Sequence, residues 1–297
     1  MKQHRFIIPA LLAFTSVAHA NVTFSNPDGV LGEPVNYPQF QSILKASELQ
    51  ISDPEGKKGN KEYFALDGDF SGIVSPYFYV DKKSEALVFK MKETHLRNEV
   101  RVHNNFRTDL PNKHYTLSAE VQLIDPIGSM KDSDSKQNEI TFLQVHNKGL
   151  DNQGTHNVPH PLLRVVWKEN NDGVKGHFWG IVKNNAVICK GTFGKKNKDK
   201  EMCKADVAYK KYDLGKAATD KATAFDITVG NKQLVIDVDG KRLVEHDIDY
   251  WRHLLSYFKA GVYNQFTHGM SEAHFTNYNI KRLKLSKSIT SVNLCEP

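Results

Sequence analysis

Apolar and polar residues alternate with a period of two along most of this chain, and this pattern predicts β-strands. Between residues 115 and 123, Leu117, Ala119, Val121 and Leu123 alternate with polar side chains, so one face of the strand is expected to be buried. Similar alternation or short β-branched and aromatic runs predict further strands at residues 95–102, 140–146, 162–167, 177–182, 225–229, 257–265 and 272–285.

A hairpin is predicted around Asp239 and Gly240, which separate two apolar runs at residues 234–238 and 242–246. Both residue types tolerate the positive φ angles of a tight primed turn. Helical patterning is confined to residues 40–49 and 250–255. Many short strands with turns between them favour an all-β fold, an antiparallel β-sandwich or jelly roll.

The first twenty residues have the three parts of an export signal. Lys2 and Arg5 precede an apolar run at residues 6–14, and the small-x-small motif at residues 18–20 ends it. We expect a mature chain of residues 21–297 that folds as a single domain, because no linker-like segment divides it. The predicted location is secreted or periplasmic, in a bacterium.

The mature chain carries a small excess of positive charge. The full sequence has 40 Lys and Arg against 34 Asp and Glu, and the signal removes two basic residues, which leaves an excess of +4. A basic exported protein suggests an anionic partner, although solubility explains the excess equally well. We expect no nucleic-acid partner, since the basic residues are scattered, and no membrane partner, since no later segment could span a bilayer. A monomer is expected.

Two of the three cysteines flank a polar loop. In an oxidising compartment, Cys189 and Cys203 are expected to form a disulfide that closes this loop. A metal site is a poorer interpretation, because there is no paired C-x-x-C spacing. Cys295 is left over and is expected to be free.

The most informative stretch is the strand at residues 257–265. Tyr257, Lys259, Tyr263 and Gln265 share one face, with Gly261 between them, whereas the opposite face is apolar. Two phenols, a cation and an amide on one face are typical of a binding surface for a sugar acid.

Two further strands have a polar face of the same kind. Arg97, Glu99 and Arg101 share a face of residues 95–102, and the planar guanidinium suits carboxylates. For this strand alone, a cross-strand ion-pair ladder on a solvated face is the better explanation. Gln144 and His146 share a face of residues 140–146. Each of these strands by itself is weak evidence for a site, whereas the three strands together indicate one.

In this order, the segments RNEVR at 97–101, QVH at 144–146 and YFKAGVYNQ at 257–265 resemble the three signature strands of the alginate lyases of polysaccharide lyase family seven. The resemblance covers about residues 64–285. Asn98 departs from the usual Ser or Thr of the family, on the face opposite the arginines. The resemblance implies a jelly roll with a concave substrate groove, and an elimination reaction on a 1,4-linked uronate polymer that needs no metal and no cofactor.

The family resemblance also implies roles for single residues. Arg97, Gln144 and His146 would neutralise the uronate carboxylate, and Tyr263 would protonate the leaving oxygen. An unperturbed phenol has a pKa of about 10, so nearby cations would need to lower it before Tyr263 could also act as a base. Tyr257 would stack on substrate or pack in the strand. The other expected substrate contacts are Glu99, Arg101, Lys259, Asn264 and Gln265.

Val145 in the middle of the QVH segment favours poly(mannuronate) as substrate within this resemblance, with a guluronate-specific or bifunctional lyase as the alternative. From another class, a non-catalytic lectin for acidic polysaccharides would need the cations but not both His146 and Tyr263. A glycoside hydrolase would need a pair of carboxylates across the bond. No second carboxylate stands beside Glu99 in the three strands, which argues against a hydrolase.

Overall fold

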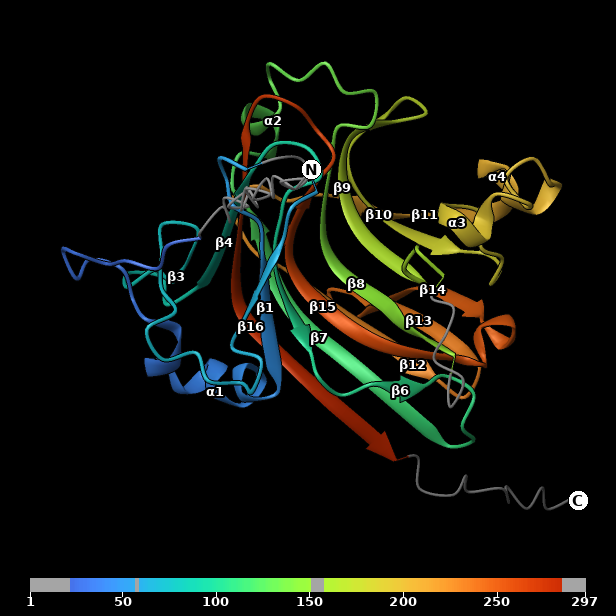
Figure 1. Cartoon of the computed structure of the whole chain (residues 1–297), viewed down its shortest axis with the longest axis horizontal. Coiled ribbons are helices and arrows are strands. Elements are labelled where there is room, and N and C mark those ends of the chain that lie inside the picture. Colours follow the sequence, from blue (N-terminus) through green and yellow to red (C-terminus); the bar gives the residue numbers. More distant parts are fainter. Residues whose placement is uncertain (1–21, 57–58, 151–157, 285–297) are drawn as a thin grey trace, which may run out of the picture.

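Two antiparallel sheets stacked face to face form the protein in a computed structural model that describes residues 22–56, 59–150 and 158–284 (Figure 1). We call the first the site sheet. Its strands, in spatial order, are β11 (Tyr209–Lys216), β10 (Val174–Lys183), β9 (Leu163–Asn171), β8 (Glu139–Leu150), β15 (Leu254–Asn264), β5 (Arg97–Val102), β1 (Ser47–Ile51) and β2 (Glu62–Phe64), with β6 (Phe106–Arg107) paired to β15.

The second sheet, the back sheet, runs in the order β14 (Lys241–Asp247), β13 (Gln233–Val238), β12 (Thr223–Gly230), β7 (Lys113–Leu123), β16 (Met270–Lys284), β4 (Leu87–Lys92) and β3 (Phe78–Val80). Helices are short: α1 (Pro38–Lys45), α2 (Pro126–Ser129), α3 (Gly191–Gly194) and α4 (Ala205–Ala208), with 3-10 turns η1 (Pro34–Asn36), η2 (Glu201–Cys203) and η3 (Asp249–Trp251). In the described part of the chain, no helix is long and apolar enough to cross a membrane.

The core lies between the two sheets and is filled by the apolar faces of their strands. Phe225 of β12 contacts Phe142 of β8 and Phe178 of β10, with ring centroids 5.3 and 5.2 Å apart. These aromatic contacts join the back sheet to the site sheet across the core. The other face of the site sheet is therefore left for polar side chains.

The predicted all-β sandwich and its strands are confirmed. The predicted hairpin joins β13 to β14, and its turn residues Asp239 and Gly240 have φ angles of 48° and 75°. The predictions that fell on residues 1–21, including the signal, and on Cys295 lie outside the described residues.

Both helical predictions extend too far. The helix expected at residues 40–49 ends at Lys45, because Ser47–Ile51 forms β1 and pairs with β5. The helix expected at residues 250–255 is only the turn η3, since β15 begins at Leu254. In both places, hydrogen bonding to a distant strand overrides the local helical pattern.

Candidate active site

The three strands with polar faces lie side by side in the site sheet, in the order β8, β15, β5 (Figure 1). Lys259 of β15 is opposite Gln144 on one side and Arg101 on the other. Two residues before Lys259, Tyr257 is opposite His146, and four residues after it, Tyr263 is opposite Arg97. The sheet thus brings together residues that are more than 160 positions apart in the sequence.

A buried ionic network lies beneath this surface. The side chains of Glu99 and Lys259 are each 2 % exposed. The Glu99 carboxylate accepts hydrogen bonds from the Lys259 ammonium and from the Gln144 amide, and Arg97 Nη1 lies 3.5 Å away. Burial opposes ionisation of Glu99, but Lys259 and Arg97 outweigh it and lower the pKa of the carboxyl. Glu99 is therefore a fixed anion that orients the Gln144 amide.

Arg97 and Tyr263 are in contact at the partly exposed end of this network. The Arg97 guanidinium lies 4.6 Å from the centroid of the Tyr263 ring, and 21 % of the Arg97 side chain is exposed. Burial raises the pKa of Tyr263, and the opposing effect of Arg97 is too small to reverse this. The condition named for Tyr263 to act also as a base, a lowered pKa, is therefore not met in the free protein, and the phenol is protonated at neutral pH.

The position of Tyr263 depends on an irregularity in β15. Pairing with β8 shifts its register between Ala260 and Tyr263, and Gly261 has a φ of 141°. A Cβ atom at Gly261 would lie 2.2 Å from the backbone oxygen of Asn98, so no other residue fits without moving the strand. Irregular pairing of this kind re-aims nearby side chains next to active sites.

His146 is neutral and has a defined hydrogen-bonding arrangement. Burial, followed by the charge of Lys259, lowers its pKa to about 3. Its Nδ1 atom accepts a hydrogen bond of 2.8 Å from the backbone N–H of Asn147, and the backbone oxygen of Asn147 lies 3.1 Å away. The shorter of these contacts, from the Asn147 N–H, favours the tautomer with the ring proton on Nε2, which can then donate to an anion.

Tyr257 packs between two other site residues. Its ring stacks on the His146 ring at a centroid distance of 5.4 Å, and the Arg101 guanidinium lies 4.2 Å from its centroid on another side. Arg101 in turn donates a hydrogen bond of 2.8 Å to Asn105. Of the two roles expected for Tyr257, the structure supports packing, which fixes the orientation of His146.

These residues bring together a partly exposed cation, a buried amide, a neutral imidazole and a protonated phenol on one face of the sheet. A family model described as alginate lyase matches residues 44–287. The chain belongs to the alginate lyases of polysaccharide lyase family 7. It is 73 % identical over 275 residues to an alginate lyase of Photobacterium sp. (strain ATCC 43367), a match that covers 93 % of this chain and 96 % of that one.

Solved structures of alginate lyases are similar to this one. The complex of alginate lyase AlyC3 with dimannuronate is 82 % identical, covers 90 % of this chain and 100 % of its own, and has a TM-score of 0.87. Alginate lyase A1-II', a member of polysaccharide lyase family 7, is 20 % identical with a TM-score of 0.58, and covers 84 % of this chain and 99 % of its own. That likeness concerns the fold alone. Together, the family and the close relatives support alginate lyase activity.

Three predicted substrate contacts of the lyase are corrected by the structure. Asn264 is fully buried and faces the back sheet, where its amide donates to the Met91 carbonyl at 2.7 Å and its oxygen accepts from Ser271 at 2.7 Å. It follows Tyr263, and neighbouring residues on a strand point to opposite faces. Glu99 and Lys259 face the site but are covered, and there Glu99 contacts Arg97, Gln144 and Lys259.

The remaining predictions for the lyase are placed as follows. Gln265 is partly exposed directly after β15, and its backbone N–H donates to the Glu139 carbonyl at 2.9 Å. Asn98 points into the interior and donates to the Tyr77 carbonyl at 2.6 Å, on the face opposite the arginines as expected. The structure contains the predicted disulfide between Cys189 and Cys203.

The sequence analysis missed charged residues of the lyase on the neighbouring strand β9. Arg164 lies opposite Gln144, on the same face, and forms an ion pair with the buried Glu139, which also binds Lys168 at 3.2 Å. Its charge acts on the pKa of Tyr263. The sequence contained an indication of this, because Arg164 interrupts an apolar run that is predicted to be a strand.

Proposed function

We propose that this lyase cleaves 1,4-linked uronate polymers of alginate by β-elimination, leaving an unsaturated 4-deoxy uronate at the new end. The observation that carries the proposal is the contact between Arg97 and the protonated Tyr263, with Gln144 and His146 on the adjacent strand. This set offers charge neutralisation and proton transfer within one surface. A non-catalytic lectin would not need the phenol and the imidazole in this register.

The first requirement of the reaction is to weaken the bond between C5 and its proton. The adjacent carboxylate is already negative, so removing the proton would place a second charge beside the first. Arg97, the Gln144 amide and the Nε2 proton of His146 neutralise that carboxylate and stabilise the enolate that develops. The Glu99–Lys259 pair supports this role, since Lys259 compensates Glu99 and leaves the Arg97 charge for the substrate.

The second requirement is the transfer of one proton. The C5–H electron pair forms the C4=C5 double bond, the bond from C4 to the glycosidic oxygen breaks, and that oxygen takes up a proton. For mannuronate, the C5 proton and the leaving oxygen lie on the same side of the ring. A single group, Tyr263, can serve both transfers: its phenol first gives up its own proton to solvent, against its raised pKa, and the phenolate then accepts the C5 proton and returns it to the leaving oxygen.

We further propose a preference for poly(mannuronate). The hydrogen bond from the Asn147 N–H to Nδ1 puts the His146 proton on Nε2, which favours donation to the carboxylate over proton abstraction. Cleavage of guluronate needs a base on the opposite side of the ring, a task for which His146 must change its tautomer. The relative AlyC3, which was solved with dimannuronate, agrees with this preference. Val145 is fully buried on the reverse face, so it acts only through packing.

The test uses separate mannuronate and guluronate block polymers and the absorbance of the unsaturated product. Wild type should act faster on the mannuronate blocks. Tyr263→Phe should remove turnover on both polymers while polymer binding and thermal unfolding stay close to wild type, because only one hydroxyl is lost. Tyr263→Phe activity within a fewfold of wild type would overturn the assignment.

We also propose that the protein is exported, on the basis of the predicted signal. Mass spectrometry of the mature N-terminus after expression in a bacterium would test this.

A further inference from the structure

The loop closed by the disulfide is strongly basic. Between Cys189 and Cys203 lie five lysines and two acidic residues, an excess of three positive charges against an excess of four for the mature chain. Lys198 lies 4.0 Å from Asp199. Among the described residues, no carboxylate lies within 4.0 Å of Lys196 or Lys200. These cations are therefore available to an anion from outside.

The loop and the segment that leads into it from β10 line an open pocket of about 430 Å³. Figure 1 shows this loop, with α3 and α4, beside β10 and β11. Its walls include Val187, Ile188 and Met202, and Met202 is 47 % exposed, so its side chain can contact a ligand. Lys196 and Lys200 also line the pocket and are exposed. The combination is an apolar wall beside two uncompensated ammonium groups.

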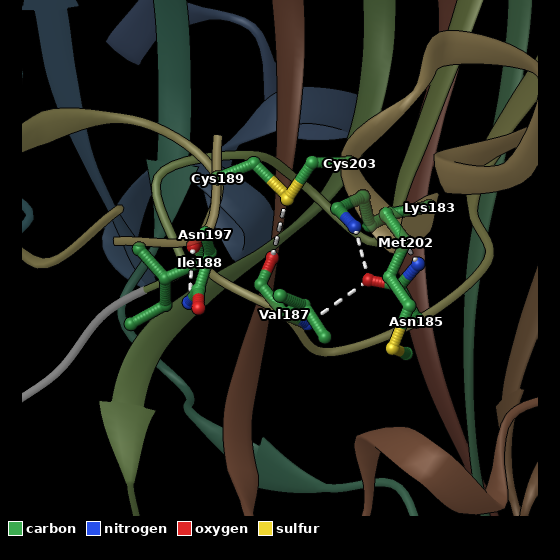
Figure 2. The surroundings of a disulfide bond; sticks show 8 residues. All are labelled: Lys183, Asn185, Val187, Ile188, Cys189, Asn197, Met202 and Cys203. Atoms are coloured by element: carbon green, nitrogen blue, oxygen red, sulfur yellow. Dashed lines mark hydrogen bonds between the residues drawn. A yellow bond between two sulfur atoms is a disulfide. The ribbon is translucent and has the colours of Figure 1, made fainter. Parts of the chain in front are cut away.

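The pocket walls are fixed rather than loosely tethered, as Figure 2 shows. The Asn197 amide donates to the Ile188 carbonyl at 3.0 Å, next to the disulfide. Asn185 joins both ends of the loop, because its amide donates to the Met202 carbonyl at 3.0 Å and its oxygen accepts from the Val187 N–H at 3.0 Å. Walls that are already held in place lose less conformational entropy when they bind a ligand.

The same hydrogen-bond system connects the pocket to the site face. Asn185 Oδ1 also accepts a hydrogen bond of 2.6 Å from Lys183, which is fully buried at the end of β10. Lys183 lies on the same face of β10 as Ile181, which is opposite Arg164 of the active site. Its ammonium lies 5.6 Å from the ring centroid of Tyr209 in β11. The pocket is thus held at a set position at the end of the site face.

We propose that this pocket is a second binding site for a uronate residue of the polymer that the active site cleaves. The sugar carboxylate would bind Lys196 and Lys200, while an apolar face of the pyranose ring packs against Ile188 and Met202. A polymer held there has a high effective concentration at the active site, without any added contact to the cleaved bond. The inference rests on the proposed function, because it takes the ligand to be the substrate.

The experiment compares Lys196→Ala/Lys200→Ala with wild type on long poly(mannuronate) and on its trisaccharide. A chain long enough to occupy both sites gains from the pocket, and a trisaccharide does not. We expect KM for the polymer to rise by roughly fivefold at low salt, with kcat and trisaccharide kinetics unchanged. The matched control is Lys45→Ala/Lys83→Ala, which removes two exposed lysines at the other edge of the sandwich and should leave polymer KM close to wild type.

The outcomes separate the two proposals. If wild type does not cleave the polymer, the proposed function fails. If wild type cleaves it and the pocket variant has the KM of wild type, the second site is refuted. An equal rise in the control variant, or an equal rise for the trisaccharide, also refutes it, since general charge or the active site would then be responsible. The polymer effect should disappear at about 0.5 M salt, where exposed charges are screened.

A second variant tests the role of the disulfide. Cys189→Ser/Cys203→Ser keeps all five lysines of the loop but frees its ends. We expect the same selective rise of polymer KM, because the walls no longer hold the lysines together. An unchanged polymer KM would show that the pocket geometry is not what binds the polymer.

Discussion

Lys259 is expected to act through Glu99 and not on the substrate, and removing its charge gives a quantitative test. In Lys259→Met, the buried Glu99 carboxylate loses its main partner and retains Arg97 at 3.5 Å. Breaking a buried pair in this way typically costs about 3–5 kcal/mol, because an uncompensated charge stays in the interior. For a domain of this size, that lowers Tm by roughly 10 °C.

The same variant should lose activity by an indirect route. Arg97 becomes the only nearby cation for Glu99, so it turns away from the substrate carboxylate. Loss of one preorganised donor to a developing charge costs about 10²–10³ in kcat. Adding Glu99→Gln removes the stranded charge while keeping an oxygen that can accept from Gln144. The double variant should therefore regain most of the lost stability, because replacing both members of a buried pair costs roughly nothing or little. Its activity should be at least about tenfold higher than that of Lys259→Met alone.

Thermal unfolding and initial rates on poly(mannuronate) supply the two readouts for the single and double variants. The control is Lys90→Met, which breaks a partly exposed pair with Glu272 at 2.8 Å on the back sheet. It should cost at most about 1 kcal/mol and leave activity unchanged. A double variant as inactive as Lys259→Met alone would mean that Lys259 contacts the substrate itself. A Lys259→Met variant as stable as wild type would refute the buried-pair argument.

Three further predictions follow from the site. Stability should fall on acidification below about pH 4.5, because folding lowers the pKa values of Glu99 and Glu139. The stabilisation from these carboxylates is complete above their unfolded-state pKa and is lost as the pH falls through their folded-state pKa. A Tm that does not depend on pH between 5 and 3 would contradict this. His146→Ala should reduce any guluronate cleavage more than mannuronate cleavage, and equal losses in block-polymer kinetics would assign His146 to carboxylate neutralisation alone. Activity should survive thorough chelation, since Arg97 and Gln144 take the role of a metal; restoration by a divalent ion after chelation would show that this is wrong.

The alternation of residue types determined a large part of the site. Because side chains on a strand point to alternating faces, the sequence alone showed that Arg97, Gln144 and Tyr263 lie on polar strand faces and that Val145 lies on the reverse. The same rule was available for Asn264, which follows Tyr263 and is buried against the back sheet. Its placement among the substrate contacts came from the family resemblance and not from the pattern.

The tertiary structure decided which polar side chains reach solvent and how they titrate. A strand pattern gives the face on which Lys259 lies but not what covers that face. The neighbours Glu99 and Gln144, on two other strands, make Lys259 a buried ion-pair partner of Glu99 instead of a substrate contact. The pKa of Tyr263 likewise depends on desolvation by surrounding elements, which outweighs the Arg97 charge that the sequence made visible. Burial is a property of the packed sheets, and no single strand contains it.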